Sequence, residues 1–110
     1  MDKSIKNKVA FVTGAALGIG RATAILLAKK GAKVMVSDIN EEEGVKTTSI
    51  INDAGGYARF FKLDVSKKDD VQKVCETIHS TEGSLDLAVN NAGIAGGIGP
   101  IHEIPFEAWE

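Results

Sequence analysis

The sequence predicts a single α/β domain with a parallel sheet and helices on both of its faces. Four short apolar segments alternate with three segments whose apolar residues recur at helical spacing, and glycines follow the helical segments. A hydrophobic content of 44% and a charged content of 25% match an ordinary soluble domain, and 110 residues leave room for only one. Right-handed crossovers then predict the strand order 3-2-1-4, with a switch point between the first and fourth strands.

The first half of the chain contains two strand–helix units. Residues 9–12 are apolar and largely β-branched or aromatic, which is typical of a strand buried on both faces. Helical spacing predicts a helix over residues 18–30, which Gly31 ends. Residues 33–37 predict the second strand. Residues 41–54 predict the second helix, whose acidic first turn suits the helix dipole.

The second half contains a third unit and a fourth strand. Residues 57–63 predict a strand, and Ser66 is expected to cap a helix over residues 67–82. This helix carries one apolar stripe, formed by Val71, Val74, Cys75 and Ile78. Residues 85–89 predict the fourth strand, and the glycines and prolines of residues 90–105 predict a loop. Crossover handedness places the third helix on the opposite face from the first two.

A glycine-rich turn, Thr-Gly-Ala-Ala-Leu-Gly-Ile-Gly, follows the first strand over residues 13–20. Gly14 permits a tight turn, while Gly18 and Gly20 let the backbone approach a pyrophosphate or another strand. The next helix offers unpaired N–H groups and a partial positive charge at its start. The turn therefore favours phosphate binding, the alternative being a simple connection. Its spacing, Gly-x-x-x-Gly-x-Gly, differs from the Gly-x-Gly-x-x-Gly of other dinucleotide folds.

Asp38 closes the second strand, where a carboxylate can accept hydrogen bonds from the hydroxyls of an adenosine ribose. It would repel a 2′-phosphate, and residues 39 and 40 include no Arg or Lys to offset that repulsion. Leu17, directly before Gly18, is not basic either. This pattern favours NAD over NADP. The alternative is that Asp38 caps the next helix.

Polar residues also follow the third and fourth strands. Asp64 can pair with the adenine amino group and Val65 can cover the ring, or Asp64 can be a loop acid that caps helix 67–82. Residues 90–93, Asn-Asn-Ala-Gly, face Gly14 across the switch point, where asparagine side chains can tie strand ends together.

These four motifs, in this order, resemble the short-chain dehydrogenases/reductases, from about Lys8 onward. The resemblance implies a Rossmann-type fold and an NAD(H)-dependent oxidoreductase that interconverts an alcohol and a carbonyl by hydride transfer. It implies that Thr13 and Asn91 mainly stabilise the sheet. The residues that it implies to bind NAD are Gly14, Leu17, Gly18, Ile19, Gly20, Asp38, Asp64, Val65, Asn90, Ala92 and Gly93.

The catalytic residues of that family find no match in this chain. The family uses a Ser and a Tyr-x-x-x-Lys pair, but the only tyrosine, Tyr57, has Phe61 four residues on. A tyrosine acid/base needs a nearby cation to lower its pKa. We therefore expect residues 1–110 to bind the cofactor without catalysing the reaction. We also expect a truncated chain, cut within a helix begun by residues 106–110, from a parent about twice as long.

Charge and composition exclude several other classes. A net charge of −2 does not favour nucleic acid, and no apolar run approaches the ~18 residues of a membrane helix. A single cysteine and a polar amino terminus suggest a cytoplasmic protein. Cys75 and His79 lie a turn apart, but two ligands do not make a metal site, so we expect no metal.

The expected partner is a small alcohol or ketone substrate of the full-length protein. Without a neighbouring strand, residues 85–89 would form an apolar edge, so we expect residues 1–110 alone to oligomerise or exchange strands. For the full-length protein we expect a homo-oligomer, a dimer or a tetramer. Two other functions stay open: a non-catalytic nucleotide-binding module and a methyltransferase with a similar sheet. The glycine spacing argues against the methyltransferase.

Overall fold

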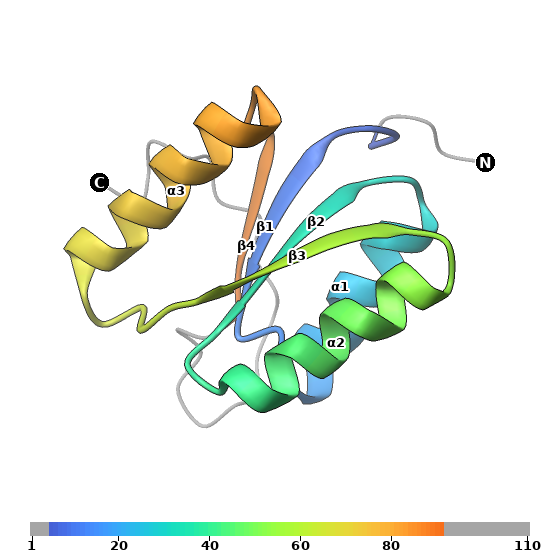
Figure 1. Ribbon diagram of the computed structural model, residues 1–110, viewed down its shortest axis with the longest axis horizontal. Coiled ribbons are helices and arrows are strands. Elements are labelled where there is room, and N and C mark those ends of the chain that lie inside the picture. Colours follow the sequence, from blue (N-terminus) through green and yellow to red (C-terminus); the bar gives the residue numbers. More distant parts are fainter. Residues whose placement is uncertain (1–4, 92–110) are drawn as a thin grey trace.

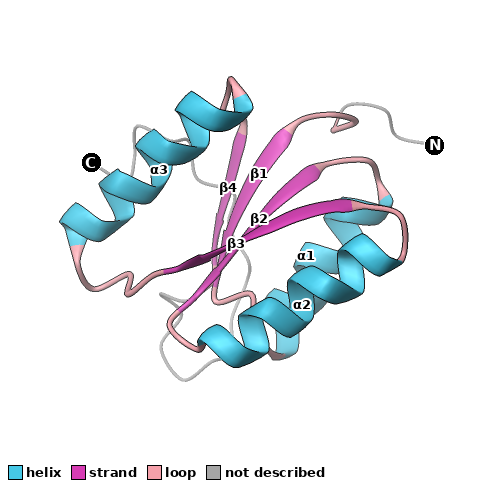
Figure 2. Ribbon diagram, viewed as in Figure 1, coloured by secondary structure: helices cyan, strands magenta, loops and turns pink. Residues whose placement is uncertain are grey.

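The computed structural model describes residues 5–91, where strands and helices alternate along the chain (Figure 1). Their bounds are β1 (Val9–Thr13), α1 (Gly18–Lys29), β2 (Lys33–Asp38), α2 (Glu41–Asp53), β3 (Tyr57–Lys62), α3 (Lys68–Glu82) and β4 (Leu87–Asn90). The strands form one parallel sheet in the order β3-β2-β1-β4. Helices α1 and α2 cover one face and α3 covers the other (Figure 2). The predicted fold class, strand order and helix placement are confirmed.

Alternate residues of the strands enter two separate hydrophobic cores, because successive side chains of a strand point to opposite faces. Val12 and Val34 pack with Ala24 and Ile51 beneath α1 and α2. On the other face, the core combines strand residues with the apolar stripe of α3: Val9, Phe11, Met35, Leu63, Val71, Cys75 and Ile78. Burial of Cys75 confirms its place on that stripe.

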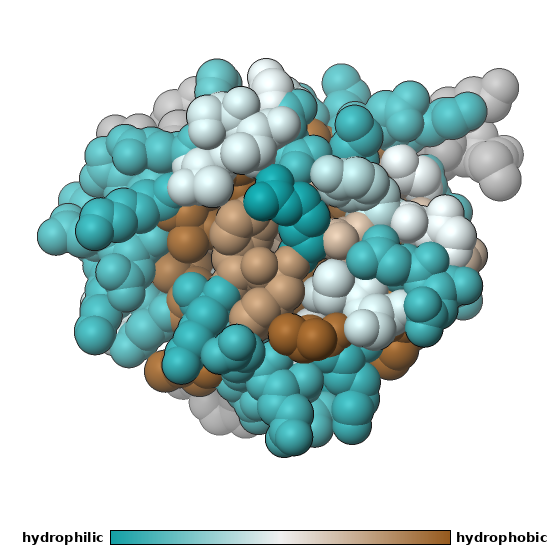
Figure 3. All heavy atoms as spheres, in the orientation of Figure 1, coloured by the Kyte–Doolittle hydropathy of each residue, from teal (hydrophilic) through white to brown (hydrophobic). Residues whose placement is uncertain are grey.

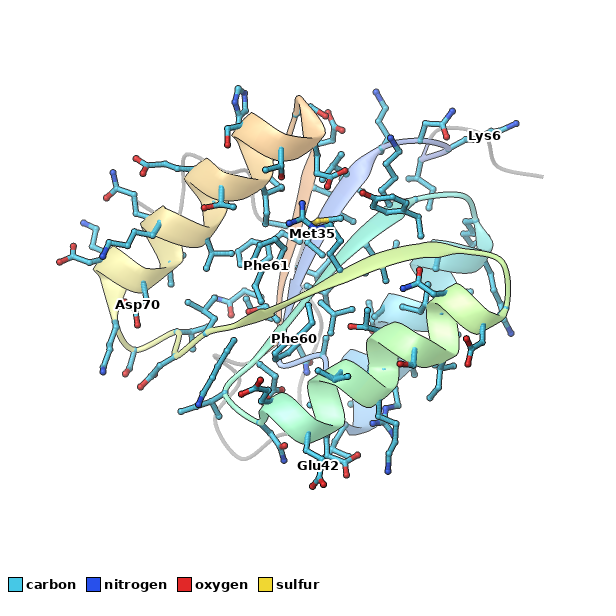
Figure 4. All side chains as sticks on the ribbon, viewed as in Figure 1. Lys6, Met35, Glu42, Phe60, Phe61 and Asp70 are labelled. Carbon is cyan, nitrogen blue, oxygen red and sulfur yellow. The ribbon has the colours of Figure 1, made fainter. Side chains whose placement is uncertain are left out.

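Two adjacent phenylalanines of β3 show this division directly. Phe60 packs against the core under α1 and α2, and Phe61 packs against the core under α3 beside Met35 (Figure 4). In the same view, Figure 3 shows hydrophobic residues in the middle of the visible surface, with hydrophilic residues around them. Arg59 lies over the Phe61 ring at 5.1 Å and shields part of this edge strand with charge.

Two predicted details are wrong. The fourth strand begins at Leu87, not at Leu85. The Asp86 carboxylate accepts the N–H of Val9 at 2.9 Å, so this N–H does not pair with a backbone carbonyl before Leu87. Ser66 is not the cap of α3: Lys67 holds that position, and the Ser66 hydroxyl donates to Asp64 instead. The predicted loop over residues 90–105 and the helix begun at 106–110 lie outside the described residues, apart from residues 90 and 91.

Within residues 5–91, the structure contains no helix with both the length and the apolar character needed to cross a membrane.

Candidate functional site

A pocket of about 170 Å³ lies where β1, β2 and β3 end. Its walls come from the turns after these strands: Gly14, Asp38, Ile39, Leu63, Asp64 and Val65. Four residues expected from the sequence, Gly14, Asp38, Asp64 and Val65, thus meet in one place. None of the described lining residues is basic, so the pocket presents two carboxylates without an opposing cation.

The glycine-rich turn is tight because two of its glycines adopt positive φ, 65° at Gly14 and 59° at Gly18. Gly20 has a different role: a Cβ there would collide with the carbonyl oxygen of Gly14. Helix α1 begins at Gly18, and no described side chain caps its N-terminus at Leu17. Its first N–H groups are therefore free of a side-chain acceptor, which suits an anion. Leu17 and Ile19 flank this turn as exposed apolar side chains.

Asp38 is held by backbone N–H groups from two directions. Its Oδ2 accepts from Ala16 N at 3.1 Å and its Oδ1 from Asn40 N at 2.9 Å. The helix α2 is capped by Asn40, whose Oδ1 accepts from Glu43 N at 3.1 Å. The alternative that Asp38 caps this helix is therefore wrong. Each carboxylate oxygen keeps a lone pair that can accept from a ligand hydroxyl.

The Asp64 side chain is held by Ser66, two residues further along the chain. Its Oδ1 accepts from the Ser66 hydroxyl at 2.6 Å and from the Ser66 N–H at 3.0 Å. These bonds, with a smaller contribution from the charge of Lys67, hold the pKa of the Asp64 carboxyl below its ordinary range. Because Lys67 occupies the N-cap position of α3, Asp64 does not cap that helix either. The carboxylate is ionised at neutral pH and faces the pocket.

The end of β4 is tied to the end of β1 by asparagines. The Thr13 hydroxyl donates to Asn90 Oδ1 at 3.1 Å, and Asn91 Nδ2 donates to the Gly14 carbonyl at 3.2 Å. Thr13 and Asn91 thus stabilise the sheet at the switch point, as predicted. The other two expected site residues of this segment, Ala92 and Gly93, lie outside the described residues.

Sequence reasoning missed two polar residues behind the glycine turn, Arg21 and Thr47. Thr47 is fully buried on α2, and Arg21 Nε donates to its hydroxyl at 2.8 Å. A signal for Thr47 existed: with Gly44 and Ile51 it marks the inward face of α2 at i, i+3 and i+7. A threonine on such a face indicates a buried polar contact.

Tyr57 lies at the opposite edge of the sheet, at the start of β3. Its hydroxyl donates to Glu82 Oε2 at 3.1 Å. Partial burial, together with this bond, raises its pKa, the reverse of what a catalytic tyrosine needs. Tyr57 therefore belongs to the cross-link between β3 and α3.

Two other features lie away from this pocket. A hollow of about 510 Å³ between the carboxyl ends of α1 and α2 is lined mainly by apolar residues such as Ile25 and Ile50. Among residues 5–91, no group of three or more His, Cys, Asp or Glu side chains is placed to hold a metal ion.

The fold and the comparisons with known proteins agree on the class. The model of the short chain dehydrogenase family matches residues 8–110. The chain therefore belongs to the short-chain dehydrogenase/reductase family.

Individual relatives support this assignment. The chain is 43% identical over 109 residues to cyclohexanol dehydrogenase of Acinetobacter sp. (strain SE19), covering 99% of this chain and 43% of that protein. It is 45% identical over 103 residues to 3beta-hydroxysteroid dehydrogenase of Mediterraneibacter gnavus, covering 94% and 37% of the two proteins. The chain thus spans about two-fifths of the length of these relatives.

Solved structures show the same fold. A hydroxysteroid dehydrogenase from Escherichia coli superposes with a TM-score of 0.79 and 36% identity, over 84% of this chain and 39% of that one. A short chain dehydrogenase/reductase from Burkholderia phymatum, solved in complex with NAD, gives a TM-score of 0.74 and 31% identity, over 80% and 31% of the two chains.

Proposed function

We propose that this chain binds NAD(H) for a dehydrogenase that interconverts an alcohol and a carbonyl. The observation that carries the proposal is Asp38, held from two sides in the wall of a pocket that Gly14, the first glycine of the turn, also lines. A fixed carboxylate beside unpaired amides matches a sugar hydroxyl next to a diphosphate. The NAD complex of the related Burkholderia phymatum protein supports this assignment.

The residues divide between the parts of the dinucleotide. Asp38 would accept hydrogen bonds from the adenosine ribose, while Asp64 would pair with adenine and Val65 would cover it. Asn90, Ala92 and Gly93 would lie along the cofactor. The glycine turn would wrap the pyrophosphate and the nearby ribose through Gly14, Leu17, Gly18, Ile19 and Gly20.

The same pocket favours NAD over NADP. A 2′-phosphate beside Asp38 would meet a carboxylate, and no described lining residue supplies a compensating cation. Bound NAD supplies the site that accepts or donates hydride. The residues of this chain would bind and orient it, and the acid–base chemistry would require a Ser and a Tyr-x-x-x-Lys pair of the kind that the family uses.

Calorimetric titration with NADH, NADPH and S-adenosylmethionine tests the proposal on the full-length protein. We expect NADH to bind at least about tenfold more tightly than NADPH, a difference of about 1.4 kcal/mol, with no binding of S-adenosylmethionine. Binding of S-adenosylmethionine alone would assign the pocket to a methyltransferase. NADH binding without turnover of any alcohol or ketone would assign it to a non-catalytic module.

We propose a cytoplasmic homo-oligomer, a dimer or a tetramer, that acts on a small alcohol or ketone without nucleic acid or membrane partners. Sedimentation velocity of the full-length protein distinguishes these states from a monomer.

A further inference from the structure

A closed ring of hydrogen bonds lies behind the glycine turn and begins and ends at Asp38. From Asp38 Oδ2 it passes to Ala16 N at 3.1 Å, and from the Ala16 carbonyl to the Thr47 hydroxyl at 3.2 Å. It continues through the Arg21 side chain to Glu43 and then through the cap residue Asn40 back to Asp38 Oδ1. We call it the Asp38 ring: Asp38, Ala16, Thr47, Arg21, Glu43 and Asn40.

Thr47 is the member of the ring that secures the glycine turn. Its hydroxyl accepts from Arg21 Nε at 2.8 Å and lies 3.2 Å from both the Ala16 and the Glu43 carbonyl oxygens. Thr47 is fully buried, so its hydroxyl is shielded from solvent. Placing a hydroxyl in the interior costs free energy unless it is hydrogen-bonded, whereas a valine would fill nearly the same volume without that cost.

The ring fixes Ala16 at both of its backbone groups. Its N–H donates to Asp38 and its carbonyl accepts from Thr47. Because a peptide unit is planar, the orientation of the Ala16 carbonyl also sets that of the Leu17 N–H. This N–H belongs to the N-cap residue of helix α1. Thr47 therefore orients an amide of the phosphate turn and, through Ala16, the carboxylate of Asp38.

Arg21 joins the two helices that carry the ring. Its Nη2 donates to the Glu43 carbonyl at 3.1 Å and to Glu43 Oε1 at 3.0 Å, while its Nε holds Thr47. The charge of Arg21 is thus engaged by Glu43, which also pairs with Lys46 at 3.6 Å. The Arg21 guanidinium, which could otherwise attract a phosphate, therefore lies in the contact between α1 and α2.

We infer that Thr47 and Arg21 are positioning residues that set the affinity and selectivity of the adenosine end of the site without touching the cofactor. The inference rests on the proposed binding of NAD(H). It goes further because it assigns the preference of the site for NAD over NADP to the whole Asp38 ring. The other side chains of this ring lie on α1, on α2 and in the turn before α2. Loss of the Thr47 hydroxyl removes a donor from the Ala16 carbonyl, and the Ala16 N–H is one of the two donors that hold Asp38, so both affinity and selectivity change.

The test compares the NADH and NADPH dissociation constants of full-length variants. Thr47→Val removes only the hydroxyl function, and we expect NADH to bind about tenfold more weakly, or about 1.4 kcal/mol. NADPH binding should change less than about threefold, because a displaced Asp38 repels the 2′-phosphate less. A purely structural role would weaken both ligands in the same proportion.

Two variants provide matched controls. Thr47→Ser keeps the hydroxyl and should bind NADH within about twofold of the wild type. Thr48→Val removes a hydroxyl from the next residue of α2, which donates to the Gly44 carbonyl of the helix's own backbone at 3.0 Å. It too should leave both dissociation constants within about twofold.

The possible results distinguish a failure of the proposed NAD(H) binding from a failure of this inference alone. A wild-type protein that does not bind NADH overturns the proposed function and this inference with it. Wild-type binding that Thr47→Val leaves unchanged, or weakens equally for NADH and NADPH, overturns the inference alone. If Thr47→Val does not fold, Arg21→Met breaks the ring at a partly exposed side chain, and an unchanged NADH-to-NADPH preference there overturns it.

Discussion

The turns that follow β1 and β3 serve the same pocket but are stabilised in different ways. The turn after β1 is held by segments far away in the sequence: Ala15 N donates to the Ser37 carbonyl, Thr47 bonds to Ala16, and Asn91 bonds to Gly14. In the turn after β3, Leu63 N donates to the Asp38 carbonyl at 3.0 Å, but the Asp64 side chain is held within three residues. Ser66 and Lys67 donate to the side chain and carbonyl of Asp64.

This difference has a physical consequence. Contacts from β2 and α2 form only when the whole sheet and its helices are assembled. The geometry of the turn after β1 therefore depends on the complete fold. The bonds that orient the Asp64 carboxylate come from Ser66, two residues along the chain, and need only that short segment. The selective part of the site therefore depends on tertiary packing alone, while in the adenine part packing places the turn and local bonds orient Asp64.

The largest expected effect comes from a variant that disrupts only the turn after β1. A methyl group in Gly20→Ala would collide with the Gly14 carbonyl, so we expect a loss of about 3 kcal/mol or more in the free energy of unfolding. Urea unfolding measures it. Gly55→Ala is the control: Gly55 has φ 91° but open space around it, and only about 1 kcal/mol should be lost. Equal losses in the two variants would show that the close approach is unimportant.

The next effect compares the two acids. Asp38→Ala should weaken NADH binding by about 1.5–3 kcal/mol, because charged hydrogen bonds are lost, and should relax the discrimination against NADP. Asp64→Ala should weaken binding by about threefold, with the discrimination unchanged. Fluorescence titration with both cofactors measures these changes. A larger effect at Asp64 than at Asp38 would reverse the assignment of the two acids.

A smaller effect concerns pH. The Ser66 bonds lower the pKa of Asp64, so in the folded protein its carboxylate stays ionised as pH falls through the ordinary aspartate range. It takes up a proton only as pH falls through the lowered pKa. Ser66→Ala should return the pKa toward its ordinary value, so the carboxylate is protonated at a higher pH. Carboxyl NMR of Asp64 in both proteins measures the shift, and an identical titration would contradict the role of Ser66.

The smallest effect lies beside the first turn. The buried Ser37 hydroxyl has no hydrogen-bond partner among the described residues. Ser37→Ala should therefore stabilise the fold by about 1 kcal/mol or less, since it removes an unsatisfied polar group. Thermal unfolding checks it. A clear destabilisation would mean that this hydroxyl has a partner in the folded protein.

The sequence predicted most of the fold because local patterns determined it. Alternating apolar strands and helices, together with one-handed crossovers, lead to the strand order and to α3 on its own face. Two details failed where a side chain made a contact that the pattern does not contain. Asp86 takes the N–H of Val9, and Ser66 bonds back to Asp64 rather than forward to a helix.

The pocket was predictable for a similar reason. Parallel strands bring their carboxyl ends to one edge, so residues that follow strands, such as Asp38 and Asp64, had to meet there. The Asp38 ring was not predictable, because it depends on how α1 packs against α2. Arg21 and Thr47 meet only through that packing, and neither belongs to a short motif.

The buried Cys75 has a practical consequence for the experiments. Burial raises the pKa of this thiol to about 11, so at neutral pH almost none of it is the reactive thiolate. The chain contains no other cysteine. A cysteine placed at Ile39, which is 61% exposed on the wall of the pocket, would then carry a maleimide dye alone. Such a labelled protein could report nucleotide entry in real time by fluorescence.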